Sequence, residues 1–416
     1  MSNYDVIVVG GGAAGIMAAG RSAENGKNVL LIEKMNYLGR KLGITGKGRC
    51  NITNSIPLDE FIAKVKPDGE FLKPAFSKFY STELINFFNS IGVKTILERG
   101  GRVFPESGKA VELVKNFTNW CKSKNVSIQT NCQVTDILLK NDTVIGVKTI
   151  VIENGKENRI SFYGKKVIVA TGGASYPATG STGDGYKLAK SLGHKINPIF
   201  PSLVPLEIDK NIVKPLAGLE LKNVKATIFI EGKLTDVEFG EMNFTDFGVS
   251  GPIILSLSRK VVASLIEKKN VQLVIDLKPA LSETKLDNRI ARDIESLKKE
   301  NYRMILNKLL PKQLIPFFIK ITQIDASKMA SKISVEERLK IRNTLKSIRF
   351  KITGSRPFSE AIITAGGVDL KKINPETMES KIVKNLFFAG EILDLDAPTG
   401  GYNLQIAFST AWIAGS

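Results

Sequence analysis

Three glycines near the start of the chain have the spacing of a diphosphate-binding turn. Gly10, Gly12 and Gly15 follow the apolar run at residues 4–9 and precede a stretch rich in alanine. Gly10 permits a tight turn, Gly12 has no side chain to keep a pyrophosphate from the backbone, and Gly15 lets the following helix lie close on the strand. The N-terminus of that helix offers free N–H groups and a partial positive charge to phosphates. The pattern predicts a dinucleotide at the end of the first strand.

An acid follows the next apolar run at the distance expected of a ribose-binding residue. Residues 28–32 are mostly apolar and lead into Glu33. A carboxylate there can accept hydrogen bonds from both ribose hydroxyls and would repel a 2′-phosphate. A purely structural turn is the alternative, because glycine-rich turns are common. We favour the dinucleotide because the strand, the helix and the acid occur together.

A glycine-rich, basic segment follows at residues 39–54. It contains four cations and four glycines and no acid. Flexible backbone can turn several N–H groups toward one anion while arginine and lysine neutralise its charge. We expect this loop to close over the pyrophosphate and to reach the reactive ring of the cofactor. The alternative is a basic surface loop without a ligand.

Two later segments repeat the pattern of a buried strand that ends in small residues. The run at 166–169 leads into the small residues 170–173, and the run at 385–388 leads toward Glu391. The segment at 174–185 is expected to be a loop near the cofactor, and 361–368 is expected to be a further strand that ends in glycines. A backbone without bulky side chains can approach a ligand closely. Glu391 can accept a hydrogen bond from a ribityl hydroxyl. A helix opened by residues 398–407 would point its N-terminal dipole toward the negative charge that gathers on a reduced flavin ring.

The apolar periodicity and the turn residues predict further elements around these segments. Helices are expected at 76–91, 110–122 and 183–192, a β-meander over the nucleotide-binding part at 126–139, 143–152 and 156–163, a turn at 154–155 and a turn-rich connection at 100–105. His194 follows the helix at 183–192. We interpret it as a capping or surface residue, because cations are favourable at helix C-termini for purely structural reasons.

The texture of the sequence changes near residue 197, where prolines cluster. Strands are expected at 224–231, 234–239 and 271–277, a turn at 241–252 before a helix at 253–266, and helices from 282 to 347, one with a capped start at Ser334. The predicted fold class is α/β, with a Rossmann-like domain. That domain is expected at 1–196 and 356–416, an inserted β-rich domain at 197–281 with a return strand at 347–355, and a helical subdomain at 282–346.

The composition of the 416 residues, 43% hydrophobic and 24% charged, is that of a globular enzyme. Cys50, Cys121 and Cys132 form no C-x-x-C pair, which excludes the redox-active disulfide of dithiol reductases and fits a reducing compartment. A single histidine argues against His-based metal sites and Ser-His-Asp hydrolysis. No secretory signal and no bilayer-spanning stretch is apparent. We therefore expect a cytoplasmic protein with no metal and no membrane partner.

The net charge of +18 is unevenly spread along the chain. Residues 283–351 contain 17 Lys/Arg against 8 Asp/Glu, a surplus of +9. A basic face can attract nucleic acid, an anionic membrane or an acidic substrate. We favour the simpler interpretation of a lysine-rich, solvated helical surface, so nucleic acid remains an alternative that is not favoured.

Five motifs in order resemble one bacterial flavoprotein family. The family has aminoacetone-oxidase-like and dehydro-bile-acid-reductase-like members. The motifs that resemble it are GxGxxG with its acid, GRKLGITGKGRCNITN at 39–54, GRVFP at 101–105, FTDFGVSGP at 244–252, and RP followed by AIITAGGV within 356–368. The resemblance covers essentially the whole chain. It implies the FAD-binding fold of the glutathione-reductase type, FAD held non-covalently, an inserted β-rich domain and a helical subdomain.

The resemblance also implies which residues contact the cofactor. The pyrophosphate would lie at Gly10, Gly12, Ala14 and Gly15 and the ribose at Glu33; Arg40, Lys41, Gly48, Arg49, Cys50 and Asn51 would lie along the pyrophosphate and ring; Val134, Ala170, Thr171 and Gly172 would flank the adenosine; Gly390, Glu391, Gly401, Tyr402, Asn403 and Leu404 would lie at the ribityl chain and ring. Family members often have Gly or Ser where Lys47 stands, so Lys47 is given no role.

The hypothesis that follows is an FAD-dependent oxidoreductase that moves a hydride through flavin N5 to or from a small organic substrate. No second GxGxxG is present. The electrons would therefore come from the substrate itself, with O₂ as a possible acceptor, or from NAD(P)H that docks transiently against the ring. Tyr176, Arg102, Glu106 and Cys50 can transfer protons, but each also has a structural explanation, and none is assigned as catalytic. An RNA-modifying flavoprotein that uses the basic insertion and a flavin-binding sensor without turnover are the alternatives. The substrate and the oligomeric state stay open.

Overall fold

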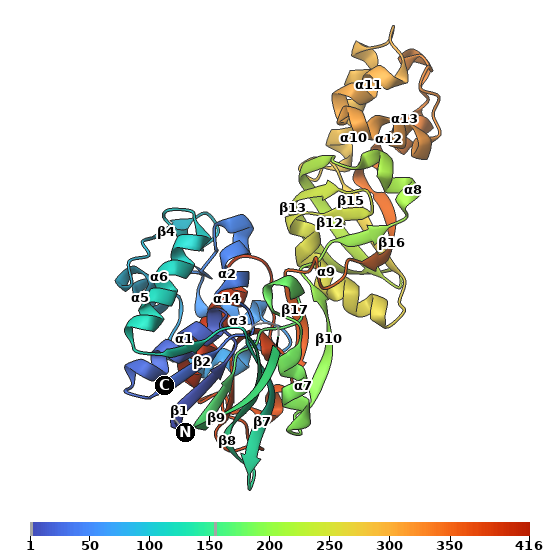
Figure 1. The fold of residues 1–416 in the computed structure, drawn as a ribbon. Helices are drawn as coiled ribbons and strands as arrows, with labels where there is room; N and C mark the ends of the chain where they lie inside the picture. The colour runs from blue at the N-terminus through green and yellow to red at the C-terminus, as the bar shows by residue number, and fades with distance from the viewer. Residues whose placement is uncertain (1–2, 154–155) are drawn as a thin grey trace. The chain divides into compact units, whose positions relative to one another are not determined.

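The computed structural model describes residues 3–153 and 156–416. The chain divides into two units, which are described separately (Figure 1). Unit 1 contains Met1–Pro201 and Phe358–Ser416, and unit 2 contains Ser202–Pro357. The turn expected at 154–155 lies outside the described residues.

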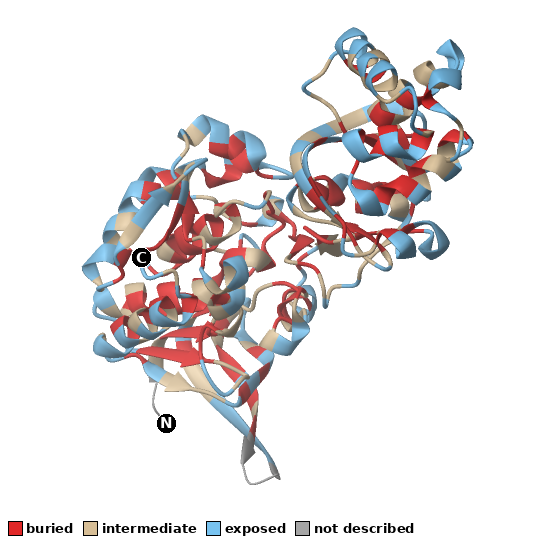
Figure 2. Cartoon of the chain, turned by 90° about the horizontal axis from the view of Figure 1, so that it is seen from above, coloured by how far each residue is buried: buried red, intermediate tan, exposed pale blue. Residues whose placement is uncertain are grey.

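The centre of unit 1 is a seven-stranded sheet with the order β6-β2-β1-β9-β8-β7 and with β18 beside β9. Strands β1 (Asn3–Val9), β2 (Val29–Ile32), β6 (Ser127–Gln129) and β18 (Leu386–Phe388) run parallel to their neighbours, as does the end of β9 (Lys156–Val169). Most of their apolar residues are buried, as expected where both faces of a parallel sheet are covered. Figure 2 colours the buried residues of the chain red. Because the strands are parallel, their carboxyl ends lie at one edge.

Strand β9 corrects the expected meander. The sequence predicts a strand at 156–163 separate from the run at 166–169, but β9 is continuous over Lys156–Val169. Its first part pairs antiparallel with β8 (Thr143–Glu153), and its second part pairs parallel with β1 from Tyr163 onward. Gly164 and Lys166 interrupt the apolar pattern, but both pair with residues of β1, so the strand continues through them. The meander is therefore an extension of the central sheet.

Two further boundaries differ from the sequence prediction for local reasons. The strand expected at 126–139 is divided into β6 and β7 (Cys132–Lys140), because Asn131 has a positive φ of 51° and turns the chain between them. The connection expected at 100–105 contains β5 (Arg102–Pro105), which lies between two short strands. These are β3 (Thr53–Asn54) and β4 (Thr95–Glu98).

The helix expected at 76–91 is two helices, α4 (Lys73–Lys78) and α5 (Ser81–Ser90). The break lies at Phe79, whose carbonyl accepts a hydrogen bond of 2.6 Å from the Ser409 hydroxyl of the terminal helix. The Phe79 ring also stacks on Trp412 with centroids 4.1 Å apart. Contacts with a distant segment therefore override the helical periodicity.

Helices and a small sheet complete unit 1. The terminal helix α14 (Tyr402–Ala414) is buried along most of its length and packs against α1 (Ala13–Glu24). The remaining helices and strands of this unit are α2 (Arg40–Ile44), α3 (Leu58–Lys64), α6 (Ala110–Ser123), α7 (Asp184–Ser191), β10 (Ile196–Ser202) and β17 (Ile363–Val368). Strands β10 and β17 pair with each other, so the chain leaves and re-enters unit 1 next to neighbouring strands.

His194 lies in the interior of unit 1. Its side chain is 2% exposed, its Nε2 is 2.9 Å from the Ser380 hydroxyl, and its ring packs edge-on against Phe388. Burial lowers the pKa of His194 to about 4. The interpretation as a capping or surface residue is therefore wrong, because the helix ends before His194 and the chain then turns into the core.

Unit 2 is a closed barrel with an attached group of helices. Its strand order is β11-β14-β13-β12-β15-β16, with β11 at Leu206–Ile208, β12 at Glu220–Ile230, β13 at Lys233–Phe244, β14 at Gly248–Ser250, β15 at Val271–Asp276 and β16 at Ile348–Ser355. The turn expected at 241–252 instead contains the end of β13 and all of β14, because Asn243 pairs with Ser250 across a tight turn. Helices α8 (Lys210–Val213) and α9 (Pro252–Ile266) belong to the same part.

Four helices form the predicted helical segment of unit 2. They are α10 (Glu283–Ser296), α11 (Tyr302–Leu309), α12 (Ile315–Thr322) and α13 (Val335–Lys346). The capped start of α13 is confirmed, since the Glu337 amide donates to the Ser334 hydroxyl and the Ser334 amide donates to the Glu337 carboxylate. No helix in the described part of the chain is long and apolar enough to cross a bilayer.

Candidate cofactor and active site

The three glycines lie at the carboxyl end of β1 and differ in their surroundings. A Cβ atom on Gly10 would lie 2.6 Å from the Ala170 carbonyl oxygen, and one on Gly15 would lie 1.7 Å from the Gly10 carbonyl oxygen. A Cβ on Gly12 would meet nothing within 4 Å. Gly12 also precedes α1 without a side-chain cap, so the free N–H groups of the helix adjoin open space. Ala14 lies in the first turn of α1, with Gly15 after it.

Glu33 holds the glycine turn against the end of β2. Its carboxylate accepts hydrogen bonds from the amides of Gly11, at 2.6 Å, and Met35, at 2.8 Å. The Glu33 carbonyl accepts from the Cys132 amide at 3.1 Å, which places the start of β7 beside it. Val134 lies two residues further along β7 and is buried.

The basic loop after β2 enters α2, which carries Arg40 and Lys41. The Arg40 guanidinium donates to Asn36 Oδ1 at 2.9 Å and to the Ala178 carbonyl at 3.3 Å, but its buried Nε has no partner among the described residues. Ala178 belongs to the loop that was expected near the cofactor. Arg40 therefore connects two of the predicted cofactor segments.

In the second half of the loop, Arg49 contacts other parts of the protein, whereas Gly48 adjoins open space. The Arg49 guanidinium is 2.5 Å from a Glu98 carboxylate oxygen and lies over the Phe104 ring, so it turns toward β4 and β5. A Cβ on Gly48 would meet nothing within 4 Å. Lys47 has a φ of 56° and is exposed, a conformation that favours glycine.

Cys50 and Asn51 end the loop in the interior. The Cys50 side chain is fully buried, and burial raises the pKa of its thiol to about 12, so it is a neutral thiol at physiological pH. The buried Oδ1 of Asn51 has no hydrogen-bond partner among the described residues. A buried polar atom without a hydrogen bond lowers stability unless a ligand or a water molecule forms that bond.

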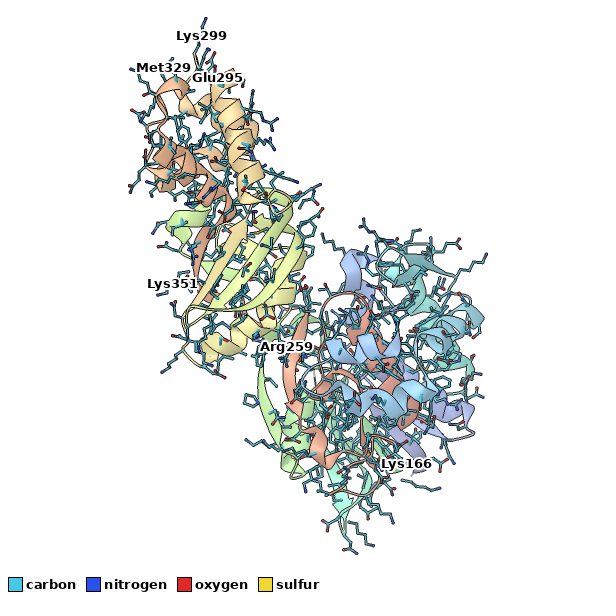
Figure 3. The ribbon with its side chains drawn as sticks, turned by 180° about the vertical axis from the view of Figure 1, so that it is seen from behind. Lys166, Arg259, Glu295, Lys299, Met329 and Lys351 are labelled. Carbon is cyan, nitrogen blue, oxygen red and sulfur yellow. The ribbon has the colours of Figure 1, made fainter. Side chains whose placement is uncertain are left out.

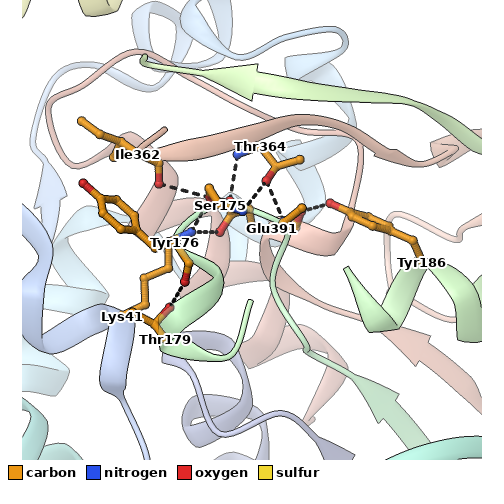
Figure 4. Close-up of polar contacts among 9 residues, drawn as sticks. Lys41, Ser175, Tyr176, Thr179, Tyr186, Ile362, Thr364 and Glu391 are labelled. Carbon is orange, nitrogen blue, oxygen red and sulfur yellow. Dashed lines mark hydrogen bonds and ion pairs between the residues drawn. The ribbon is translucent and has the colours of Figure 1, made fainter. Parts of the chain in front are cut away.

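A polar network joins residues from the N-terminal and C-terminal parts of the chain (Figure 4). Lys41 Nζ lies 2.8 Å from Glu391 Oε2 and 2.7 Å from the Ser175 hydroxyl. Glu391 Oε1 accepts from the Ser175 hydroxyl and from the Thr364 amide, each at 2.9 Å. Lys41 lies on α2, and Glu391 follows β18 in a short helical turn, Gly390–Ile392. The structure therefore brings two predicted cofactor residues into direct contact.

Ser175 and Thr364 are site residues that the sequence interpretation did not select. Ser175 lies in the loop at 174–185, which was expected near the cofactor without a chosen residue, and Thr364 lies in β17. The Thr364 hydroxyl accepts from the amides of Ala174 and Ser175, at 2.8 and 3.1 Å. The strand end at 361–368 was a signal for Thr364, but no local pattern connects it to Glu391.

The other predicted residues of this region lie beside the network. Ala170 is buried at the end of β9, and Gly172 has a φ of 72°. The Thr171 hydroxyl oxygen is buried without a partner among the described residues. Tyr176 lies just beyond Ser175 and has a φ of 53°. By contrast, Arg102 and Glu106 have exposed side chains at β5.

At the start of α14, the side chains contact other residues of the protein, so the backbone N–H groups are the part that can bind a ligand. Gly401 has a φ of 98°, and a Cβ there would lie 2.4 Å from the Thr53 carbonyl oxygen. The Asn403 amide bonds to both the amide and the carbonyl of Ala397, and the Tyr402 ring packs on Phe61. Leu404 is half-buried. The first N–H groups of α14 lack intrahelical partners and remain available to a ligand.

These features fit FAD. Three buried polar atoms without partners, Arg40 Nε, Asn51 Oδ1 and Thr171 Oγ1, lie within the predicted cofactor segments. Open space adjoins Gly12 and Gly48, the carboxylates are placed at two strand ends, and two helix N-termini supply N–H donors. Within the described residues, no cluster of His, Cys, Asp and Glu can hold a metal ion.

Comparison with known proteins identifies the family. Residues 4–416 match the family described as HI0933-like protein Rossmann domain. The chain belongs to this family. The resemblance inferred from the motifs and the Rossmann-type α/β fold class are thereby confirmed.

Two relatives of the HI0933-like chain match it along nearly its full length. It is 30% identical over 410 residues to the 3-dehydro-bile acid delta(4,6)-reductase of Clostridium scindens, covering 98% of this chain and 97% of the relative. It is 30% identical over 419 residues to the ribosomal RNA dihydrouridine synthase of Escherichia coli, covering 99% and 97%. A Haemophilus influenzae protein of the same name has the same identity.

Solved structures share the fold at low sequence identity. A quinol-fumarate reductase superposes with a TM-score of 0.53 and 16% identity, covering all of this chain and 71% of that chain. The 3-ketosteroid delta1-dehydrogenase of Sterolibacterium denitrificans superposes with a TM-score of 0.52 and 12% identity, covering 100% and 99%. These structures show the fold alone. The family match and the full-length relative identify the HI0933-like chain as an FAD-dependent oxidoreductase.

Proposed function

We propose that this oxidoreductase adds a hydride to a carbon–carbon double bond conjugated with a carbonyl group in a small organic substrate. The observation that carries the proposal is the convergence of the glycine turn, the Lys41–Glu391 network and the start of α14 at the edge of one sheet. Two full-length relatives support the reaction class, because their names, a delta(4,6)-reductase and a dihydrouridine synthase, both describe saturation of a carbon–carbon double bond.

In this proposal, the chain's residues hold the cofactor and set its surroundings. The N–H groups at the start of α1 would bind the diphosphate beside Gly12, and Glu33 would accept hydrogen bonds from the ribose. Glu391 would accept a hydrogen bond from the ribityl chain while Lys41 compensates its charge, and the N–H groups at the start of α14 would stabilise negative charge on the reduced ring. The bound flavin supplies hydride chemistry at N5.

NAD(P)H is the proposed electron donor. The sequence has no second GxGxxG for a dedicated nucleotide domain, so the donor would dock transiently. The donor loses one hydride and becomes NAD(P)⁺, while the substrate gains a hydride at one carbon of the double bond and a proton from solvent at the other. The electron pair is thereby fully accounted for.

Anaerobic mixing of the purified holoenzyme with NADH or NADPH tests the proposal. We expect the flavin absorbance near about 450 nm, a general flavin property, to bleach and to return when a conjugated enone is added, with the saturated product detected by mass spectrometry. A flavin reoxidised by air but by no enone would contradict the proposal. A flavin that no donor reduces would instead favour a sensor.

A uridine in RNA is the second candidate substrate. Two relatives that cover 99% of this chain are named ribosomal RNA dihydrouridine synthase, and residues 283–351 carry a surplus of +9. The uracil ring contains the same conjugated arrangement. Incubation of transcribed ribosomal RNA with enzyme and NAD(P)H, followed by nucleoside mass spectrometry, tests this candidate. Absence of dihydrouridine together with efficient enone reduction would exclude it.

A further inference from the structure

The outer face of the unit 2 barrel exposes apolar and aromatic side chains. On β13, Leu234 is 60% exposed, Val237 47% and Phe239 62%. Phe229 on the neighbouring strand β12 is half-buried and pairs with Leu234. Exposed apolar side chains that gather in one patch mark an interaction site.

Strand register places these side chains on one continuous face of four strands. Paired residues of antiparallel strands share a face. One row across the face is Leu234, Phe229, Gln272 and Lys351; the next is Val237, Thr227, Val274 and Arg349; the third begins with Phe239, Lys225 and Asp276. The opposite side of the same strands holds the barrel core, where Ile228 and Leu273 are fully buried.

Cations border the apolar centre of this face. The Arg349 guanidinium lies 5.6 Å from the Phe229 ring centroid, and Lys351 is exposed one pair further along β16 (Figure 3). No ion pair with a described residue engages Arg349 or Lys351. One acid on the face, Asp276, is compensated by Lys346 at 2.6 Å and by Lys225 at 4.0 Å. A second acid, Glu241, is exposed two residues beyond Phe239 on β13, so the cations Lys225, Arg349 and Lys351 outnumber the acids. The face is therefore positively charged as well as aromatic.

We propose that this face, formed by β13, β12, β15 and β16, binds single-stranded RNA, with bases stacked on Phe239 and Phe229 and phosphates at Arg349 and Lys351. Aromatic side chains on the exposed face of a sheet, flanked by cations, suit flat bases and a charged backbone. The inference rests on the second candidate function, the modification of RNA.

Fluorescence anisotropy with a labelled RNA oligonucleotide of about 12 nucleotides, within the site sizes of such surfaces, tests the proposal on the full-length holoenzyme. We expect Phe239→Leu to weaken binding about 5- to 100-fold and Phe239→Tyr to preserve it, because stacking needs an aromatic ring. The exposed position lets each variant fold. Replacing Arg349 and Lys351 by Gln should reduce the slope of log affinity against log salt by about 0.7 for each cation.

Matched controls separate this face from the basic helices and from general surface effects. Lys320→Gln removes an exposed cation of α12, and Leu97→Ala removes an apolar side chain of unit 1 that is 63% exposed. Both should bind RNA as the wild type does. Equal affinity of Phe239→Leu and the wild type would overturn the proposal, as would binding of anionic phosphatidylglycerol vesicles or self-association that depends on Phe239 in place of RNA binding.

Chemistry is scored separately so that the two proposals can fail independently. Reduction of the flavin by NAD(P)H should be unchanged in every face variant. Dihydrouridine formed equally by Phe239→Leu and the wild type would leave the RNA function standing and reject the face. RNA bound through the face without any dihydrouridine would reject that function and leave the binding site standing.

Discussion

Gly12 and Gly15 lack a side chain for different physical reasons. At Gly15 a Cβ would collide with the Gly10 carbonyl oxygen, so glycine is needed for the packing of α1 on β1. At Gly12 the space is open, so glycine is needed only if a ligand lies there. The two positions therefore separate folding from cofactor binding.

The variant Gly12→Asp should weaken FAD binding with little change in stability, whereas Gly15→Ala should lower stability. Aspartate is a favourable residue before a helix, so Gly12→Asp should leave the unfolding free energy of the apoprotein within about 0.5 kcal/mol of wild type. Its charge and volume should weaken FAD binding by about 100-fold or more. Gly15→Ala should lower the unfolding free energy by about 2–3 kcal/mol through overpacking.

Chemical denaturation of the apoproteins and flavin titration measure the two quantities. If Gly12→Asp binds FAD as tightly as the wild type, the diphosphate does not lie at this helix N-terminus.

His194 makes stability depend on pH. Its pKa is lowered from 6.5 to about 4 in the folded chain, so the unfolded chain takes up a proton first as the pH falls. The stability contributed by the neutral, buried ring is fully present above pH 6.5 and is lost progressively between pH 6.5 and 4. The loss should approach about 3 kcal/mol.

Urea denaturation of the wild type and of His194→Gln across that range isolates this effect, since the chain has one histidine. The difference in unfolding free energy between the wild type and His194→Gln should become smaller as the pH falls. A difference that is constant with pH would show that the imidazole does not titrate as expected.

Helix α13 shows how an element begins through local side-chain contacts. Ser334 and Glu337 satisfy each other's backbone amides, at 3.2 and 2.9 Å. Glu337 also forms an ion pair with Lys328 at 2.7 Å. The helix start is therefore specified within a few residues, which is why the sequence was sufficient to predict it.

Ser334→Ala should lower the unfolding free energy of unit 2 by about 1 kcal/mol, because one amide of the first turn loses its acceptor. Thermal or urea denaturation of the full chain measures the change. Ser347→Ala, at the other end of the same helix, is the control and should change stability by less than about 0.5 kcal/mol. Equal effects of the two variants would argue against the cap.

At the scale of the whole molecule, the chain is two compact units, and the second is continuous in sequence. The barrel closes through pairing of Leu206 with Ser355, so the two ends of unit 2 adjoin within that unit. A closed barrel has no open strand edge, and the helix α9, whose apolar side chains pack against these strands, belongs to the same unit.

Residues 202–357 expressed alone should therefore unfold in one cooperative transition. Unit 1, with residues 202–357 replaced by a short Gly/Ser linker, should still bind FAD, since all the predicted cofactor residues belong to it. Circular dichroism of the first fragment and flavin absorbance of the second measure these outcomes. Loss of flavin from a folded unit 1 variant would show that unit 2 contributes to the cofactor site.

The sequence by itself determined the elements that depend on local chemistry. The glycine turn, Glu33, the fully apolar strands and the capped start of α13 were each visible because turn residues, periodicity and caps act over a few positions. The ordered motifs were sufficient for the family and for FAD as its cofactor.

Only the tertiary structure decided which distant residues meet. Lys41 and Glu391 are 350 positions apart, and Ser175 and Thr364 join them from two further segments. The break at Phe79, the burial of His194 and the continuity of β9 likewise depend on partners that no local window contains. The physical reason is that a hydrogen bond or a strand pairing is selected by what lies beside it in space, and the packing of the whole sheet determines that neighbour.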